Sequence, residues 1–220
     1  MIAINKQYFK NWKFIDLFAG LGGFRLALES LGAECVYSSE WDIPVQEVYY
    51  NNFGDIPDGD ITKVNEKSIP NHDILCAGFP CQAFSISGKQ RGFRDDRGTL
   101  FFDVARIVKE KKPKIVFMEN VKNFATHDSG KTLQIVKSTM EKLGYTFNQK
   151  VLNSVDYGIP QKRERLYMVC FRKDLLIKNF TFPKAIKLTK HVEDYLLQDS
   201  SLTEHLYVNR PDTYYNNLQD

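Results

Sequence analysis

The sequence has few of the residues that mark metal sites, disulfide frameworks or membrane spans. Its 220 residues include only four cysteines, at positions 35, 76, 81 and 170, and four histidines scattered among polar residues. The cysteines show no Cys-x-x-Cys spacing and no nearby pair of histidines, which argues against a structural zinc site and against disulfides. No run of about eighteen apolar residues is present, and the first residues lack the hydrophobic core of a signal peptide. We therefore expect a cytoplasmic protein with no metal ion and no membrane span.

The remaining composition is that of an ordinary globular protein. Hydrophobic residues make up 43% of the chain and charged residues 26%. The formal net charge of +3 is too small to identify a nucleic-acid partner, because clustering of basic residues matters more than their total. One main domain is the default for a chain of this length.

A long loop is predicted in the middle of the chain. It follows the short apolar strand at 74–77 and ends before a helix that begins at Leu100, so that about twenty residues without an apolar period lie between them. Cys81 comes directly after Pro80 near the start of this loop. The second half is basic, with Lys89, Arg91, Arg94 and Arg97 against Asp95 and Asp96. A nucleophile beneath an anion-binding loop and a plain buried cysteine beside a solvated loop are equal alternatives on this stretch alone.

The start of the chain has the pattern of a nucleotide-binding fold. An apolar strand at 13–18, which contains one buried acid at Asp16, is followed by the glycine turn 19–23 and then by a helix. Glycines allow the backbone to approach a ligand closely. Glu40 ends the next predicted strand, where an acid can accept hydrogen bonds from ribose hydroxyls. Because the turn reads Gly-x-Gly-Gly, a nucleoside cofactor without phosphates is favoured over a dinucleotide.

Three further positions each leave two interpretations open. Trp41 can stack on an adenine ring or anchor the helix that follows it. Asp60 can reach an adenine amino group or be a solvated turn residue. Glu119, which follows the apolar strand 115–118, lies where α/β sheets bind ligands but can also be a capping acid.

The second half of the chain continues the alternation of helices and strands. We predict helices at 100–111 and 132–143, and strands at 145–152 and 165–171. Arg163 and Arg165 stand two apart at the start of the last strand and so point to the same side. This arrangement suits joint contact with a carboxylate or a base edge, although exposed arginines at strand ends are common.

Four motifs occur in order between about residues 12 and 175, a length typical of one catalytic domain. They are Asp16-Leu-Phe-Ala-Gly-Leu-Gly-Gly23, Gly78-Phe-Pro-Cys-Gln82, Glu119-Asn-Val121 and Gln161-Lys-Arg-Glu-Arg165. With them the chain resembles the C5-cytosine DNA methyltransferases. The resemblance implies an α/β fold with a Rossmann-like, doubly wound, mostly parallel sheet. It also implies S-adenosylmethionine as cofactor and double-stranded DNA as substrate.

The same resemblance implies a role for individual residues. Cys81 would attack C6 of a flipped cytosine, Glu119 would contact N3 and the exocyclic amine, and Arg165 with Arg163 would fix the base. The cofactor would be held by Phe18, Ala19, Gly20, Leu21, Gly22, Gly23, Glu40, Trp41, Asp60, Ile61, Gly78, Pro80 and Leu100. DNA contacts would come from Gln82, Ser85, Ser87, Lys89 and Arg97.

The chain departs from the family after the last motif. Family members continue into a target-recognition domain and two further motifs, whereas residues 186–220 resemble at most the start of that region or form an irregular tail. We therefore expect a catalytic domain at 1–185 that is weak or inactive alone. It would be one half of a split restriction-modification methylase, completed by a second chain, or a truncated fragment.

Four other functions fit less well. A catalytically silent module that binds DNA or a partner protein is disfavoured by the joint presence of Cys81, Glu119 and Arg165. A transfer-RNA cytosine methyltransferase of the same fold is a lesser alternative. A thiol hydrolase lacks a well-placed histidine base, and hydride transfer lacks a pyrophosphate loop.

Overall fold

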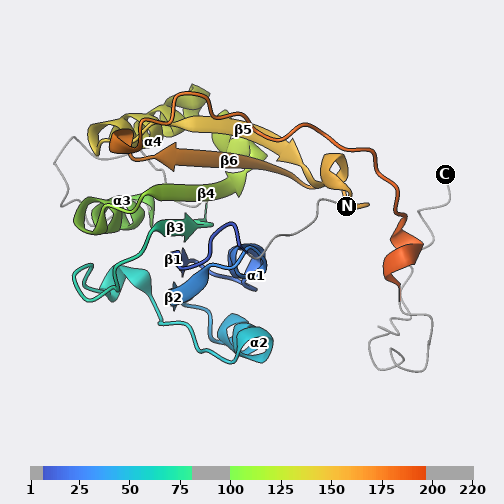
Figure 1. Ribbon diagram of the computed structural model, residues 1–220, viewed down its shortest axis with the longest axis horizontal. Coiled ribbons are helices and arrows are strands. Elements are labelled where there is room, and N and C mark those ends of the chain that lie inside the picture. The colour runs from blue at the N-terminus through green and yellow to red at the C-terminus, as the bar shows by residue number, and fades with distance from the viewer. Residues whose placement is uncertain (1–6, 81–99, 197–220) are drawn as a thin grey trace.

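The computed structural model describes residues 7–80 and 100–196. They form one six-stranded sheet in the order β2-β1-β3-β4-β6-β5, with helices on both faces (Figure 1). The main elements are β1 Lys13–Leu17, α1 Gly23–Ser30, β2 Glu34–Ser39, α2 Ile43–Phe53, β3 Ile74–Ala77, α3 Leu100–Lys111, β4 Ile115–Val121, α4 Lys131–Lys142, β5 Asn148–Asn153 and β6 Glu164–Phe171. Short 3-10 helices connect them, among them η1 Ile61–Lys63 between β2 and β3.

The sheet confirms the predicted fold class. Strand β1 pairs in parallel with β2 and with β3, and β3 pairs in parallel with β4. Strand β6 runs antiparallel to both β4 and β5. The protein is thus an α/β domain with a doubly wound, mostly parallel sheet, in which one edge is antiparallel.

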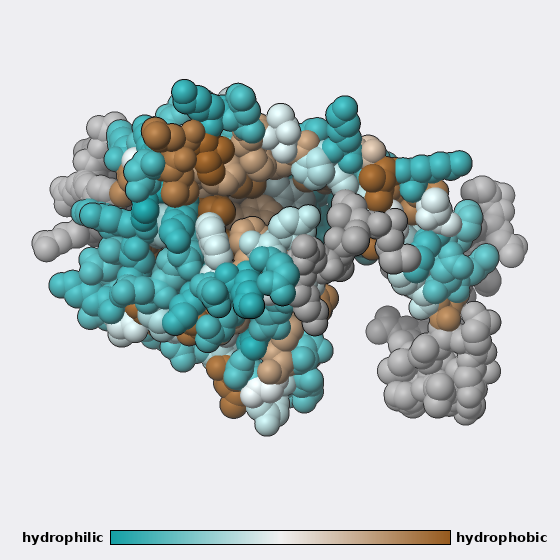
Figure 2. All heavy atoms as spheres, in the orientation of Figure 1, coloured by the Kyte–Doolittle hydropathy of each residue, from teal (hydrophilic) through white to brown (hydrophobic). Residues whose placement is uncertain are grey.

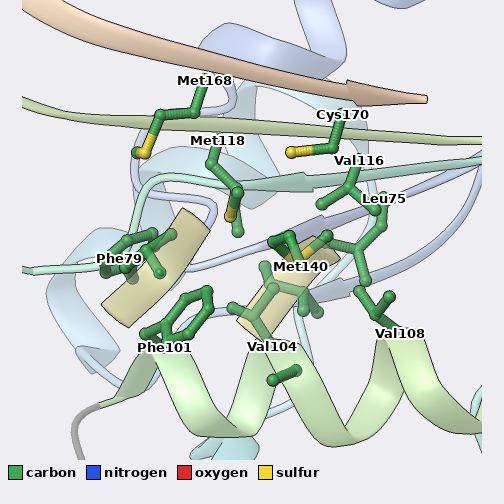
Figure 3. Close-up of a cluster of buried hydrophobic side chains, with 14 of the residues drawn as sticks. Leu75, Phe79, Phe101, Val104, Val108, Val116, Met118, Met140, Met168 and Cys170 are labelled. Carbon is green, nitrogen blue, oxygen red and sulfur yellow. The ribbon is translucent and has the colours of Figure 1, made fainter. Parts of the chain in front are cut away.

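The main core lies between the sheet and helices α3 and α4. Phe101, Val104 and Val108 come from one face of α3 and meet Met140 of α4 beneath the sheet (Figure 3). The sheet contributes alternate side chains that point toward these helices, including Leu75, Val116, Met118, Met168 and Cys170. Burial of this apolar surface is the main favourable term in folding, and it fixes where the strands end.

The opposite face is covered less completely. A smaller cluster forms there, in which Leu28 of α1 packs with Phe14 and Cys76. Phe24 of α1 also packs edge-on against Phe117 of β4, with the ring centroids 5.1 Å apart. Farther along, Tyr167 and Val169 of β6 are only half-buried on this face. Side chains alternate along β6 between a buried face and a partly open face.

The outer surface is mostly hydrophilic, with exposed apolar side chains around α2 (Figure 2). Among them are Ile43, Val48 and Tyr50. In the part of the chain that the structure describes, no helix is long and apolar enough to cross a membrane.

The predicted boundaries hold for β3 and α3 and shift elsewhere. The first strand ends at Leu17 rather than at Phe18, because Phe18 has a positive φ of 56° and already belongs to the turn. Strand β5 begins at Asn148 rather than at Tyr145. Tyr145 is 1% exposed and its hydroxyl donates to the Pro113 carbonyl oxygen at 2.6 Å, so this residue anchors the turn instead.

Replacing Tyr145 with Phe tests that anchor. The Tyr145→Phe variant should lose about 1–2 kcal/mol of unfolding free energy, because the buried Pro113 carbonyl oxygen loses its donor. The measurement is urea unfolding followed by circular dichroism. Tyr8→Phe is the control, since Tyr8 is 66% exposed, and it should stay within about 0.5 kcal/mol of the parent. Equal losses in both variants would contradict the assignment.

Candidate active site

The candidate site lies at the carboxyl ends of the parallel strands. Ser39 of β2, Leu17 of β1, Ala77 of β3 and Met118 of β4 are aligned across the sheet. The residues that follow them directly are therefore brought together along one edge of the sheet, the edge formed by the carboxyl ends of the parallel strands. They are Glu40, Phe18, Gly78 and Glu119, all of them predicted site residues, and ligands of α/β sheets bind at this edge.

The glycine turn after β1 is tightly packed from one side. Gly20 and Gly22 both have positive φ, at 55° and 84°, a region that side chains with a Cβ rarely adopt. A Cβ on Gly22 would lie 2.1 Å from Cε2 of Phe53. Phe53 at the end of α2 therefore supports the turn from behind, whereas Gly20 and Gly23 have nothing within 4 Å of a Cβ position.

Glu40 connects this turn to two other segments. It is largely buried, its Oε2 accepts a hydrogen bond from the Gly20 N–H at 2.9 Å, and its Oε1 accepts one from the Asp42 N–H at 3.1 Å. The Glu40 N–H donates to the carbonyl oxygen of Asp58 at 2.8 Å. Its carboxylate is thus held in place by backbone donors and keeps lone pairs for a further donor.

The segment that precedes η1 lies beside β2. Asp58 forms a parallel bridge with Ser39, whose Oγ donates to the Gly59 carbonyl oxygen at 2.8 Å. Asp60 caps η1, because its Oδ1 accepts from the N–H and the hydroxyl of Thr62 at 3.0 and 2.8 Å. These bonds hold the pKa of Asp60 below its usual value. The bridge and the hydrogen bonds of this segment place the residues that precede Asp60 beside the end of β2, and they give Asp60 a capping role that the sequence did not suggest.

Trp41 and Leu21 are exposed at the same corner. The Trp41 side chain is 74% exposed, so it does not anchor α2 by burial, which was one of its two predicted roles. Leu21 is exposed as well, and its carbonyl oxygen accepts from Nδ2 of Asn52. An exposed indole ring beside a buried carboxylate is suited to stacking on a flat heterocycle.

Glu119 and Arg165 form an ion pair between the end of β4 and the start of β6. Arg165 Nε lies 3.0 Å from Glu119 Oε1. The pair forms because β6 runs antiparallel to β4, so that Val121 aligns with Arg165 and the start of β6 meets the end of β4. Burial raises the pKa of Glu119, and the charges of Arg165 and Arg163 oppose that shift. Arg163 itself is exposed, and its N–H donates to Asn153 Oδ1 at 3.0 Å.

The strand that leads to Cys81 is adjacent to this pair. A Cβ on Gly78 would lie 4.0 Å from Glu119 Oε2, and Asn120 Nδ2 donates to the Phe79 carbonyl oxygen at 2.8 Å. Pro80 is the last described residue before the gap and Leu100 is the first after it. The predicted residues Cys81, Gln82, Ser85, Ser87, Lys89 and Arg97 lie outside the described residues.

Three residues that shape the edge were missed by sequence reasoning. Asn120 holds Phe79, and Phe53 supports Gly22, as described above. Arg25 is a buried residue of α1, which pairs with Glu29 of the same helix and with Asp55 after α2, and it lies 4.7 Å from the Phe53 ring centroid. Asn120 stood inside a recognised motif, but a buried arginine carries no signal in the sequence.

One fully buried acid lies near the turn. Asp16, predicted as a buried acid, is fully buried at the end of β1, and among the described residues neither of its carboxylate oxygens has a hydrogen-bond partner. Burial raises its pKa to about 8, against the opposing effect of Arg25. Across residues 7–80 and 100–196, no group of three His, Cys, Asp or Glu side chains is arranged to hold a metal ion.

The protein is thus an α/β domain with a candidate ligand site at the carboxyl ends of its parallel strands. Residues 12–219 match the family of C-5 cytosine-specific DNA methylases, and the chain belongs to that family. It is 68% identical over 219 residues to the type II methyltransferase M.HhaI of Haemophilus parahaemolyticus, covering all of this chain and 67% of that protein. It is 52% identical over 188 residues to M.SsoII of Shigella sonnei, covering 84% of this chain and 50% of that protein.

Solved structures share the fold. The Dnmt2 methyltransferase of S. pombe has a TM-score of 0.68 at 20% identity and covers 86% of this chain and 62% of its own. A methyltransferase of Entamoeba histolytica has a TM-score of 0.65 at 22% identity, over 86% of this chain and 61% of its own. The predicted methyltransferase fold is thereby confirmed, and the chain spans only about half to two thirds of the proteins it matches.

Gly22 provides a test of the packed turn. Gly22→Ala should cost about 2 kcal/mol or more of unfolding free energy, because the new methyl group meets the Phe53 ring at a positive φ. Gly23→Ala is the matched control, since Gly23 begins α1 with open space around it, and helix propensity should make it neutral or slightly stabilising. Thermal unfolding measures both. A Gly22→Ala protein as stable as Gly23→Ala would show that Phe53 does not support the turn.

Proposed function

We propose that this chain is the catalytic part of a DNA (cytosine-5)-methyltransferase that moves a methyl group from S-adenosylmethionine to C5 of a flipped cytosine. The observation that carries the proposal is the ion pair of half-buried Glu119 with Arg165, next to the strand that leads to Pro80 and Cys81. Family membership supports the same assignment.

The described residues of the edge fit an adenosyl cofactor. The buried Glu40 carboxylate has acceptor capacity left for ribose hydroxyls, and the exposed Trp41 ring can stack on adenine. The turn has room at Gly20 and Gly23 for close approach of a ligand. We assign cofactor contacts to Phe18, Ala19, Gly20, Leu21, Gly22, Gly23, Glu40, Trp41, Asp60, Ile61, Gly78, Pro80 and Leu100. When bound, the sulfonium of this cofactor supplies an electrophilic methyl group.

The protein's own residues would make the base reactive. C5 of cytosine is a poor nucleophile, and addition of the Cys81 thiolate to C6 turns the ring into an enamine. A free cysteine thiol has a pKa of about 8.5, so a cation such as Arg165 is needed to favour the thiolate. Glu119, whose pKa is raised by burial, can share a proton with N3 and limit the negative charge on the ring. After methylation, C5 loses its proton and the thiolate is expelled.

The DNA must be distorted for this chemistry. C5 cannot be reached inside a duplex, so the cytosine has to be flipped out at a cost of a few kcal/mol. We assign phosphate and gap-filling contacts to Gln82, Ser85, Ser87, Lys89 and Arg97. Contacts from the two basic residues among them make binding weaken with salt.

We also infer that another polypeptide segment completes the enzyme. The chain spans 67% of M.HhaI and half of M.SsoII. The sheet face is partly open at Phe117, Tyr167 and Val169. This openness is evidence for a further segment that packs there, since large apolar side chains on a sheet face are normally covered. A separate complementing chain and the remainder of a longer chain would both supply it.

The direct test is methyl transfer from labelled S-adenosylmethionine to duplex DNA. The chain alone should be weak, and the chain joined to the third of M.HhaI that it does not match should be active. If both bind cofactor and neither transfers methyl groups, the chain is a silent module. Activity on transfer RNA in place of DNA would contradict the substrate.

Glu119→Gln tests the acid. A carboxyl group with a raised pKa holds its proton at low pH and loses it as the pH rises through that pKa, so wild-type methyl transfer should lose the Glu119 contribution on the alkaline side. Glu119→Gln should be slower by about 10²–10⁴-fold and should lack that part of the pH profile. Glu164→Gln is the control, because Glu164 pairs with Lys122 on the surface. Equal rates in the two variants would contradict the role of Glu119.

A further inference from the structure

Arg106 connects helix α3 to the segment that contains the predicted adenine contacts Asp60 and Ile61. It lies in α3, and its guanidinium uses all three nitrogens. Nε donates to Asp103 Oδ1 at 2.9 Å, Nη1 to Glu66 Oε2 at 2.7 Å, and Nη2 to the Ile61 carbonyl oxygen at 2.7 Å. Glu66 and Ile61 precede it by 40 and 45 residues. One side chain therefore ties α3 to the segment between β2 and β3.

That segment is held at several points, which include the buried side chain of Ile61 in the main core and a bond from Lys111 of α3 to the Lys67 carbonyl oxygen at 3.0 Å. Residues 58 and 59 are held by Ser39 of β2, through the bridge and the hydroxyl bond described above. Ile61 is 3% exposed, and its carbonyl oxygen accepts from the Val64 N–H at 3.1 Å as well as from Arg106. Asp60 and Ile61 thus lie between an anchor on the sheet and an anchor on α3.

The anchor on α3 needs the shape of arginine. The Arg106 side chain is 26% exposed, and its two carboxylate partners are also partly shielded. Charge-assisted bonds of this kind are stronger than neutral ones, and the planar guanidinium directs its donors along fixed lines. A lysine has a single ammonium group, which cannot meet Asp103, Glu66 and the Ile61 carbonyl oxygen together with the same geometry.

We propose that Arg106 is a positioning residue for the adenine ring of the cofactor. It contacts no cofactor itself. It fixes the backbone of Ile61, and through it the neighbouring Asp60, at the distance from Glu40 and Trp41 that an adenosine needs. The inference rests on the proposed function, in which Asp60 and Ile61 bind the adenine edge.

A displaced adenine site has a defined kinetic signature. The loss should appear in the affinity for adenosine-containing ligands, since only the 60–61 segment moves. Glu119 and Arg165 pair with each other at β4 and β6, whereas Arg106 bonds Asp103, Glu66 and Ile61. In the active, joined protein, the KM for S-adenosylmethionine should therefore rise while kcat at saturation stays within about twofold.

The test is calorimetric binding of S-adenosylhomocysteine and of 5′-methylthioadenosine to the 220-residue chain and to Arg106→Lys. Both Kd values should rise about tenfold, equal to about 1.4 kcal/mol, because both ligands carry the adenine ring. Arg172→Lys is the matched control. Arg172 also bonds the carboxylate of Asp174 and the backbone carbonyl of Lys112. It follows β6 and therefore lies beside the start of β4, at the end of the sheet away from the site. Its Kd values should change by less than about twofold.

The outcomes separate this inference from the proposed function. If the wild-type chain binds neither ligand, the proposed cofactor site fails and the role of Arg106 fails with it. If the wild-type chain binds and Arg106→Lys binds equally well, only the positioning role is overturned. A loss confined to S-adenosylhomocysteine, or an equal loss in Arg172→Lys, overturns it too.

A second variant covers the case in which Arg106→Lys does not fold. Glu66→Gln removes the charge from one partner of Arg106 and keeps an acceptor oxygen, so it should fold and still loosen the anchor. Both Kd values should rise about threefold, which is less than the effect of losing the bond entirely, because the bond to Arg106 is weakened and not removed. Unchanged values in a folded Glu66→Gln protein would overturn the proposal.

Discussion

The site depends on one strand, β6, which runs antiparallel to its neighbours β4 and β5 in an otherwise parallel sheet. If β6 ran parallel to β4, its first residues would lie at the opposite end of the sheet from Glu119. Because it runs antiparallel, Arg165 reaches Glu119 Oε1 at 3.0 Å. A carboxylate with a pKa raised by burial is thereby kept beside a guanidinium that limits the shift. Topology, rather than local sequence, brings Glu119 and Arg165 together.

Three acids at this edge are buried in different ways. Glu40 accepts two backbone N–H bonds, Glu119 has an arginine, and Asp16 has no hydrogen-bond partner among the described residues. An unpaired buried carboxyl group is costly when charged, which agrees with the raised pKa of Asp16. Perturbed pKa values concentrate at functional sites, and Asp16 lies near the end of β1, just before the turn assigned to the cofactor.

Much of the fold and part of the edge could be predicted from the sequence. Apolar periodicity located α3 at its true ends and identified β4, and the acids at strand ends predicted Glu40, Asp60 and Glu119 together. Arg25, Phe53 and Arg106 could not be predicted, because their long-range partners lie 24 to 45 residues away in the chain and depend on the packing of helices. The left-handed Phe18 and the late start of β5 are tertiary effects of the same kind.

The central claim is that Cys81 forms a covalent bond to the target cytosine. The most direct measurement is mass spectrometry of the chain, joined to the unmatched third of M.HhaI, after incubation with cofactor and a duplex that carries 5-fluorocytosine. Fluorine cannot leave C5 as a proton does, so elimination stops and DNA should remain bound to the peptide that contains Cys81. A duplex that stays free while ordinary cytosine is methylated, or one that is trapped equally by Cys81→Ala, would contradict the account.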